Sequence, residues 1–219
     1  MSFQTLVTAA QTYFPTLKIG YKDQSTFMKI LGTLLFFNKD FMTNYITTIG
    51  DTVYFSSASW VSLHPVTAEI VLMHECVHMS DEKKWTSILF GFSYLLPQIL
   101  IFICPILFFF IHWYIALPIM LFFALPLPAY FRMIWEKRAY IAGLYAQYKL
   151  SKILNFNPNL PAQVIDDLGQ FTSGAYYWVW PFSNINADFN NAVTAINAGQ
   201  RPYDDNNVFN MIDDLVTKV

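Results

Sequence analysis

Charged residues and cysteines are scarce in this 219-residue chain, and both shortages limit what the protein can be. Charged residues make up only 13% of the sequence, against about 25% in an ordinary soluble domain, and 55% of the residues are hydrophobic. A net charge of −2 provides no basic surface for a nucleic acid, so we expect no nucleic-acid partner. The two cysteines, Cys76 and Cys104, stand in very different contexts, which argues against a disulfide framework.

The shortage of charge is concentrated in one segment, residues 85–131, where 47 consecutive residues include no Asp, Glu, Lys or Arg. A continuous helix of that length would extend about 70 Å, whereas a bilayer core is about 30 Å thick and takes about 20 residues per crossing. We therefore expect two transmembrane helices, near residues 86–111 and 114–131, with a turn at His112-Trp113. The alternative is a buried helical hairpin in a soluble core, although such helices rarely stay apolar on every face for so long.

Basic residues stand at both ends of this segment and are missing from its turn. They are Lys83, Lys84, Arg132, Lys137 and Arg138. Because cytoplasmic flanks carry an excess of Lys and Arg, we expect both ends on the cytoplasmic side of the inner membrane. A hairpin of two spans would return the chain to the side from which it entered, so the parts before and after it would share one compartment.

An H-E-x-x-H motif, His74-Glu75-Cys76-Val77-His78, stands just before the apolar segment. Residues 66–79 follow Pro65 and contain neither Gly nor Pro, which favours a helix. On a helix the two histidines lie one turn apart on one face and can bind one metal ion, with Glu75 near enough to act as a general base. We expect Cys76 on the opposite side, in the core. The alternative is a pair of core or interface histidines beside a membrane helix.

A catalytic zinc site usually has three protein ligands and an open position for water, and Glu136 is the strongest candidate for the third ligand. It lies in an expected helix, residues 132–154, which would emerge beside the motif helix if the hairpin folds back. The alternative is a surface ion pair between Glu136 and Arg132. His64 has no spacing that recommends it, and Asp81 lies too far along the helix from the first histidine, so we expect Asp81 only as a hydrogen-bond partner of a ligand.

These features together resemble a known family, the gluzincin membrane endopeptidases of the heat-shock and CAAX-processing type. The resemblance covers about residues 45–145 and depends on H-E-x-x-H, the hydrophobic hairpin, and Glu136-x-x-Ala139. It implies that His74, His78 and Glu136 bind Zn²⁺ and that Glu75 is the base. Family members often have an acidic residue four positions after the third ligand, where this chain has Tyr140, so Asp81 would have to support the histidines. The composition would suit a bacteriophage or bacterial protein.

The remaining segments predict further parts of the domain. The pattern of residues 45–50 and 51–56 predicts a β-hairpin around Gly50-Asp51. Residues 52–56 would either bind an extended substrate by strand addition or have a purely structural role. Residues 23–37, 184–198 and 204–218 read as helices. The aromatic segment 171–182 includes Tyr176 and Tyr177, which would either stabilise the oxyanion or form part of a belt at the membrane surface.

The sequence thus predicts a mainly α (α+β) fold: a zincin-like helical metallopeptidase core with a short β-hairpin and an inserted two-helix transmembrane hairpin. Residues 1–84 and 132–219 would form the catalytic domain, facing the cytoplasm, and residues 85–131 the hairpin. The predicted function is a membrane-anchored zinc endopeptidase whose partners are a peptide or protein substrate and the lipid bilayer. The alternative is a non-enzymatic membrane scaffold with at most a structural metal. The sequence does not determine the oligomeric state.

Overall fold

The computed structural model describes residues 3–34, 39–125, 127–172 and 184–219. It is 70% helix and 6% strand, which confirms the mainly α class. The elements are α1 (Phe3–Tyr13), β1 (Lys18–Tyr21), α2 (Thr26–Leu34), β2 (Thr47–Ile49), β3 (Thr52–Phe55), α3 (Ala58–Leu63), α4 (Pro65–Trp85), α5 (Ser87–Leu95), the 3₁₀ segments η1 (Gln98–Phe102) and η2 (Cys104–Phe109), α6 (Trp113–Ala124), α7 (Tyr130–Leu154), α8 (Leu160–Thr172), α9 (Ile185–Asn197) and α10 (Asn206–Val216).

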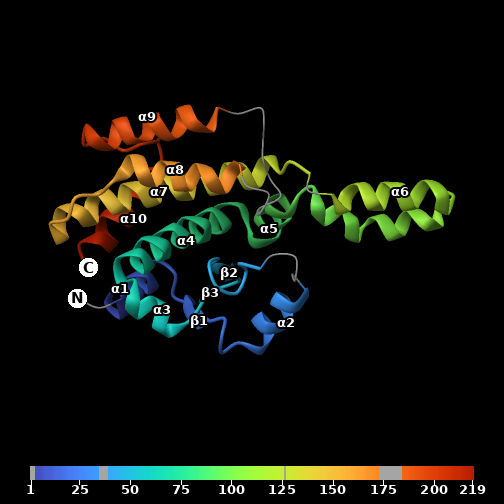
Figure 1. Cartoon of the computed structure of the whole chain (residues 1–219), viewed down its shortest axis with the longest axis horizontal. Helices are drawn as coiled ribbons and strands as arrows, with labels where there is room; N and C mark the ends of the chain where they lie inside the picture. The colour runs from blue at the N-terminus through green and yellow to red at the C-terminus, as the bar shows by residue number, and fades with distance from the viewer. Residues whose placement is uncertain (1–2, 35–38, 126, 173–183) are drawn as a thin grey trace.

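Two long helices, α4 and α7, pack side by side through the middle of the molecule (Figure 1). Pro65 begins α4 at a position where its missing N–H costs no helical hydrogen bond. Gly143 of α7 lies against α4, since a Cβ added there would come within 3.8 Å of Cγ2 of Ile70, and a small residue at this point favours a close approach of the two helices. Cys76 is fully buried in the core that they share, as predicted. Both predicted helices are confirmed, and α4 continues beyond the predicted end to Trp85.

The other helices surround this pair. α1, α3 and α10 pack against α4, while α8 and α9 pack against α7 and each other, and the two chain ends lie near one another (Figure 1). The side chain of Asp205 caps α10 by accepting a hydrogen bond of 3.2 Å from Val208 N, which stabilises an exposed helix start. The two predicted C-terminal helices are confirmed as α9 and α10. The predicted helix at residues 23–37 is confirmed as the shorter α2; residues 35–38 lie outside the described part of the chain.

A small sheet with strand order β1-β3-β2 packs below α4 in Figure 1. β2 and β3 form the predicted antiparallel hairpin, and Gly50 takes φ +54° in its turn, a conformation that favours glycine. β1, which pairs in parallel with β3, was not predicted because its four residues carry no clear alternation. Since β3 has a neighbour on each side, it has no free edge, and the prediction that residues 52–56 add a substrate strand is wrong.

The charge-free segment is broken into short pieces. α5 ends before Pro97, two 3₁₀ segments follow, and α6 begins after His112 and packs against both of them, extending away from the body (Figure 1). The turn at His112-Trp113 is as predicted, but the continuous helix expected over residues 86–111 is absent, because Pro97 and Pro105 cannot donate helical hydrogen bonds. The second helix ends at residue 124, before Pro126 and Pro128.

The surface of this segment is strongly apolar. Ile88, Phe102 and Phe109 are each at least 80% exposed. Within the described residues, no single helix is both long and apolar enough to cross a bilayer, although α5 and residues 98–109 together reach the required length and composition with a bend of 95° between them.

Candidate metal centre

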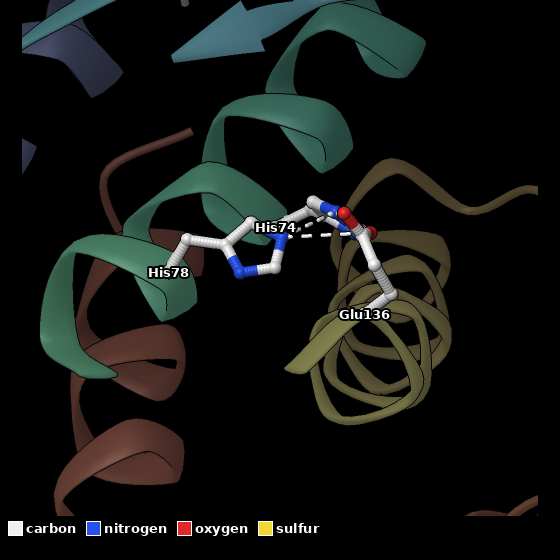
Figure 2. Close-up of side chains that lie close together, drawn as sticks. All are labelled: His74, His78 and Glu136. Carbon is white, nitrogen blue, oxygen red and sulfur yellow. Dashed lines mark hydrogen bonds and ion pairs between the residues drawn. The ribbon is translucent and has the colours of Figure 1, made fainter. Parts of the chain in front are cut away.

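Three side chains from the two central helices converge on one point (Figure 2). His74 and His78 lie one turn apart on α4, and their Nε2 atoms are 3.2 Å apart. Glu136 reaches across from α7, and its Oε2 lies 3.4 Å from Nε2 of His74 and 3.5 Å from Nε2 of His78. The structure thus brings together the three residues that the sequence predicts as metal ligands, although the apolar segment separates Glu136 from the two histidines in the chain.

The spacing of these atoms suits a tetrahedral metal ion. Zinc binds nitrogen and oxygen at about 2.0–2.1 Å, so two ligand atoms at tetrahedral positions lie about 3.3 Å apart. The three measured separations, 3.2, 3.4 and 3.5 Å, are all close to this value. Two imidazoles and one carboxylate also form a donor set typical of catalytic zinc, which leaves a fourth position open. The separations of these three residues are therefore compatible with a zinc ion.

Without a metal, the cluster holds a proton. Burial opposes a charge on His78, but the charge of Glu136, its hydrogen bond to His78 and the charges of Glu75 and Asp81 together outweigh burial and raise the pKa of His78 to about 9. Burial likewise opposes the charge on Glu136, but the two histidines hold its pKa well below the ordinary value. A metal ion that binds here near neutral pH must therefore displace a proton from His78. The other ring nitrogen of this residue, Nδ1, is buried and has no hydrogen-bond partner.

Glu75, the predicted general base, follows the first histidine on α4 and is only 8% exposed. Its Oε2 accepts a hydrogen bond of 2.7 Å from the hydroxyl of Thr48 on β2. The segment that leads to β2 is held by Lys22, a fully buried residue whose ammonium donates to the carbonyls of Phe41 (2.6 Å) and Tyr45 (2.8 Å). The sheet therefore contributes directly to the orientation of Glu75. No motif in the sequence singles out Thr48, because the contact depends on how the β-hairpin packs against α4.

Asp81 has a different partner from the one expected. It is buried on α4, but its Oδ1 pairs with the guanidinium of Arg138 at 3.1 Å, and it makes no hydrogen bond to His74 or His78. Arg138 also pairs with Asp205 at 2.8 Å, which connects α4, α7 and the start of α10. The prediction that Asp81 hydrogen-bonds a ligand is therefore wrong; its negative charge still favours the protonated form of His78.

Tyr140 lies on α7, four residues after Glu136. Its ring packs edge-on against the ring of His74, with centroids 4.8 Å apart, and against Phe171 of α8 at 5.6 Å. Asp167, also on α8, is buried nearby; burial raises its pKa to about 6, and the charge of His74 acts in the opposite direction. Asp167 accepts a hydrogen bond of 2.8 Å from Gln163. Asp167 was not predicted at the site, because no motif in α8 indicates that this helix lies near the histidines.

The first helix of the apolar segment closes another side of the cluster. Phe90 and Tyr94, one turn apart on α5, each place a ring centroid 6.2 Å from that of His78, and the hydroxyl of Tyr94 donates a hydrogen bond to Oε1 of Glu136. Neither residue was predicted at the site, because the stretch that carries them reads as membrane-facing. A signal was present: a tyrosine hydroxyl inside an apolar stretch needs a polar partner.

The remaining predicted candidates lie elsewhere. His64 is exposed and bonds through Nδ1 to the carbonyl of Trp60, and His112 stacks on Tyr114 at the far turn of the apolar segment. Tyr176 and Tyr177 lie outside the described residues.

Comparisons of the chain with protein-family models, with curated proteins and with solved structures found no match. A functional assignment therefore depends on the arrangement of His74, Glu75, His78 and Glu136.

Proposed function

We propose that this protein is a membrane-anchored zinc endopeptidase in which His74, His78 and Glu136 hold the metal and Glu75 is the general base. The observation that carries the proposal is the triangle of two imidazole nitrogens and one carboxylate oxygen with sides of 3.2, 3.4 and 3.5 Å. A bound zinc ion would polarise the scissile carbonyl and make water a better nucleophile. A structural zinc would instead require a fourth protein ligand, and the described residues include no fourth His, Cys, Asp or Glu in this group.

The role of Glu75 is to accept a proton from the attacking water and deliver it to the leaving amine. Its position one residue after His74 brings its carboxylate close enough for its charge to act on His78, and Thr48 restrains one of its oxygens. A restrained, largely buried carboxylate suits this role because proton transfer depends first on geometry.

A peptide substrate fits the neighbouring sheet. β2 is an outer strand, with β3 on one side only, and its Thr48 contacts Glu75. An extended peptide that added to this edge would pass beside the base and the ligand cluster. This is why we favour a peptide bond over another amide as the substrate.

Membrane anchoring is the second part of the proposal, and it is supported by the exposed apolar surface of residues 86–125. Trp85 stands at the base of this segment and is 50% exposed, and Trp113 stands at its far turn and is 67% exposed. These positions suit residues at the two lipid–water interfaces. Lys83 and Lys84 are exposed at its base, whereas Lys137 and Arg138 are used in ion pairs with Asp188, Asp81 and Asp205. The cytoplasmic orientation therefore depends mainly on the two exposed lysines.

The test compares peptide hydrolysis and zinc content in the detergent-purified wild type, Glu75→Gln and Glu82→Gln. Glu82 lies on the same helix outside the cluster and serves as the matched control. The proposal predicts that Glu75→Gln keeps its zinc and loses turnover by a factor of at least about 10², a usual contribution of general base catalysis, while Glu82→Gln matches the wild type. Full hydrolysis by zinc-loaded Glu75→Gln would overturn the mechanism, and a wild type with zinc but no hydrolysis of any peptide would favour a non-enzymatic scaffold.

A further inference from the structure

The two carboxylate oxygens of Glu136 have different partners. Oε2 faces Nε2 of His74 and of His78, at 3.4 and 3.5 Å, whereas Oε1 accepts the hydrogen bond from the hydroxyl of Tyr94. Glu136 is only 6% exposed, and a buried polar atom without a partner costs about 1–3 kcal/mol, more if it is charged. The phenol therefore satisfies one oxygen and leaves the other directed at the two imidazoles.

Tyr94 is held in this position by the turn of α7 that carries Glu136. Nε of Arg132 donates a hydrogen bond of 2.9 Å to the carbonyl of Tyr94, and the guanidinium lies 5.1 Å from the centre of the tyrosine ring. The indole of Trp135 donates a bond of 3.1 Å to the hydroxyl of Ser93, the residue before Tyr94. These bonds fix α5 to α7 at the level of the predicted third ligand.

α5 is also the first helix of the apolar segment. It leads directly into η1, and Gln98 at the start of η1 donates a hydrogen bond of 2.7 Å to the carbonyl of Leu127, on the chain that returns towards α7. The base of the apolar segment and the metal cluster are therefore one connected structure, with Tyr94 as the direct link between them.

We infer that Tyr94 is a positioning residue for the metal site: its hydroxyl orients Glu136 so that a single carboxylate oxygen is presented to the metal beside His74 and His78. The inference rests on the proposed zinc site and adds a dependence of metal affinity on the position of α5. Hydrogen-bond partners of metal ligands usually contribute about 10–100-fold to metal affinity, and we expect a loss of this size when the hydroxyl of Tyr94 is removed.

The experiment measures the Kd for zinc by chelator competition in the full-length, detergent-purified protein. The variants are Tyr94→Phe, which keeps the ring contacts with His78 and Arg132, and Tyr94→Leu, which removes the ring. Tyr114→Phe is the matched control, because Tyr114 belongs to the same apolar segment but is 56% exposed on α6. We expect the Kd to rise about 10–100-fold in Tyr94→Phe and to stay unchanged in Tyr114→Phe.

A second readout separates positioning from simple packing. Cobalt(II) substituted for zinc reports coordination geometry through its visible absorption, and we expect the spectrum to change in Tyr94→Phe. An unchanged Kd and cobalt spectrum in Tyr94→Phe, even with a lower melting temperature of the metal-free protein, would overturn the inference, as would a loss of affinity confined to Tyr94→Leu. A folded wild type that binds no zinc would instead overturn the proposed function itself.

Discussion

Thr48 on β2 donates a hydrogen bond of 2.7 Å from its hydroxyl to Oε2 of Glu75 on α4. This bond joins the outer strand of the small sheet to the residue that we propose as the general base. It also explains how a sheet of only three described strands matters to the site: the β2–β3 hairpin sets the side chain that orients Glu75.

Replacing Thr48 by valine is expected to lower turnover about tenfold without changing zinc content. Valine keeps the shape and the strand preference of threonine but cannot donate the bond, whose loss costs about 1–1.5 kcal/mol. The measurement is kcat for peptide hydrolysis beside zinc content, with Thr47→Val, the preceding strand residue, as the control. Wild-type kcat in Thr48→Val would show that Glu75 needs no such restraint.

Removing Arg138 is expected to destabilise the fold on the order of 3 kcal/mol, because it leaves the carboxylate of Asp81 buried without its partner. The adjacent Lys137 pairs with Asp188, whose side chain is 43% exposed, so its loss should cost at most about 1 kcal/mol. Thermal unfolding of Arg138→Met and Lys137→Met in detergent measures both. Equal losses in the two variants would contradict the structural role given to Arg138.

The stability of the metal-free protein is expected to fall as the pH rises from 6.5 to 8. The pKa of His78 is raised to about 9 in the folded state, so its stabilisation is complete below the unfolded pKa of about 6.5 and is lost as the pH approaches 9. Over this window the loss is on the order of 2 kcal/mol. The measurement is the free energy of unfolding of the metal-free protein at pH 6.5 and at pH 8, with a chelator present.

Two other buried groups with shifted pKa values change the stability less than His78 in this window. Burial raises the pKa of Asp167 to about 6, so its effect falls mainly at lower pH. Burial lowers the pKa of Lys22 to about 8, at the upper edge of the window, where relief of the cost of burying its charge begins to offset a small part of the loss. Glu136→Gln removes the main charge that raises the pKa of His78. In this variant the free energy of unfolding should therefore hardly change between pH 6.5 and 8. If the stability of Glu136→Gln falls with pH as steeply as that of the wild type, the pH dependence does not come from the pairing of His78 with Glu136.

If the chain crosses the bilayer twice, near residues 86–111 and 114–131 as the sequence predicts, the turn at His112-Trp113 faces away from the cytoplasm. Trp113→Cys should then react with a membrane-impermeant maleimide from the far side only, and Lys83→Cys from the cytoplasmic side only. The native cysteines, Cys76 and Cys104, are both buried and give a low background. Labelling of Trp113→Cys from the cytoplasmic side, or from neither side, would show that this segment does not cross.

The central helices and the ligand triad could be predicted because their signals are local. H-E-x-x-H specifies its own geometry once it lies on a helix, and Pro65 with the following residues, which include neither Gly nor Pro, predicts that helix. Glu136 could be predicted only through the assumption that the apolar segment folds back on itself. The close packing of α4 and α7 agrees with that assumption.

What the sequence did not reveal depends on contacts between distant segments. Thr48, Tyr94 and Asp167 reach the site from a strand, from α5 and from α8, and none of these has a spacing relative to the motif that predicts the contact. Asp81 was expected beside a histidine because it shares their helix face, but Arg138 of α7 lies closer and takes its carboxylate.

The most direct test of the whole account is the zinc content of the purified protein and its ligand variants. We predict about one zinc per chain in the wild type and in His64→Ala, whose histidine is exposed and outside the cluster, and a clear loss in His74→Ala, His78→Ala and Glu136→Ala. A folded wild type without zinc, or zinc fully retained in Glu136→Ala, would contradict the three-ligand site on which the proposed function depends.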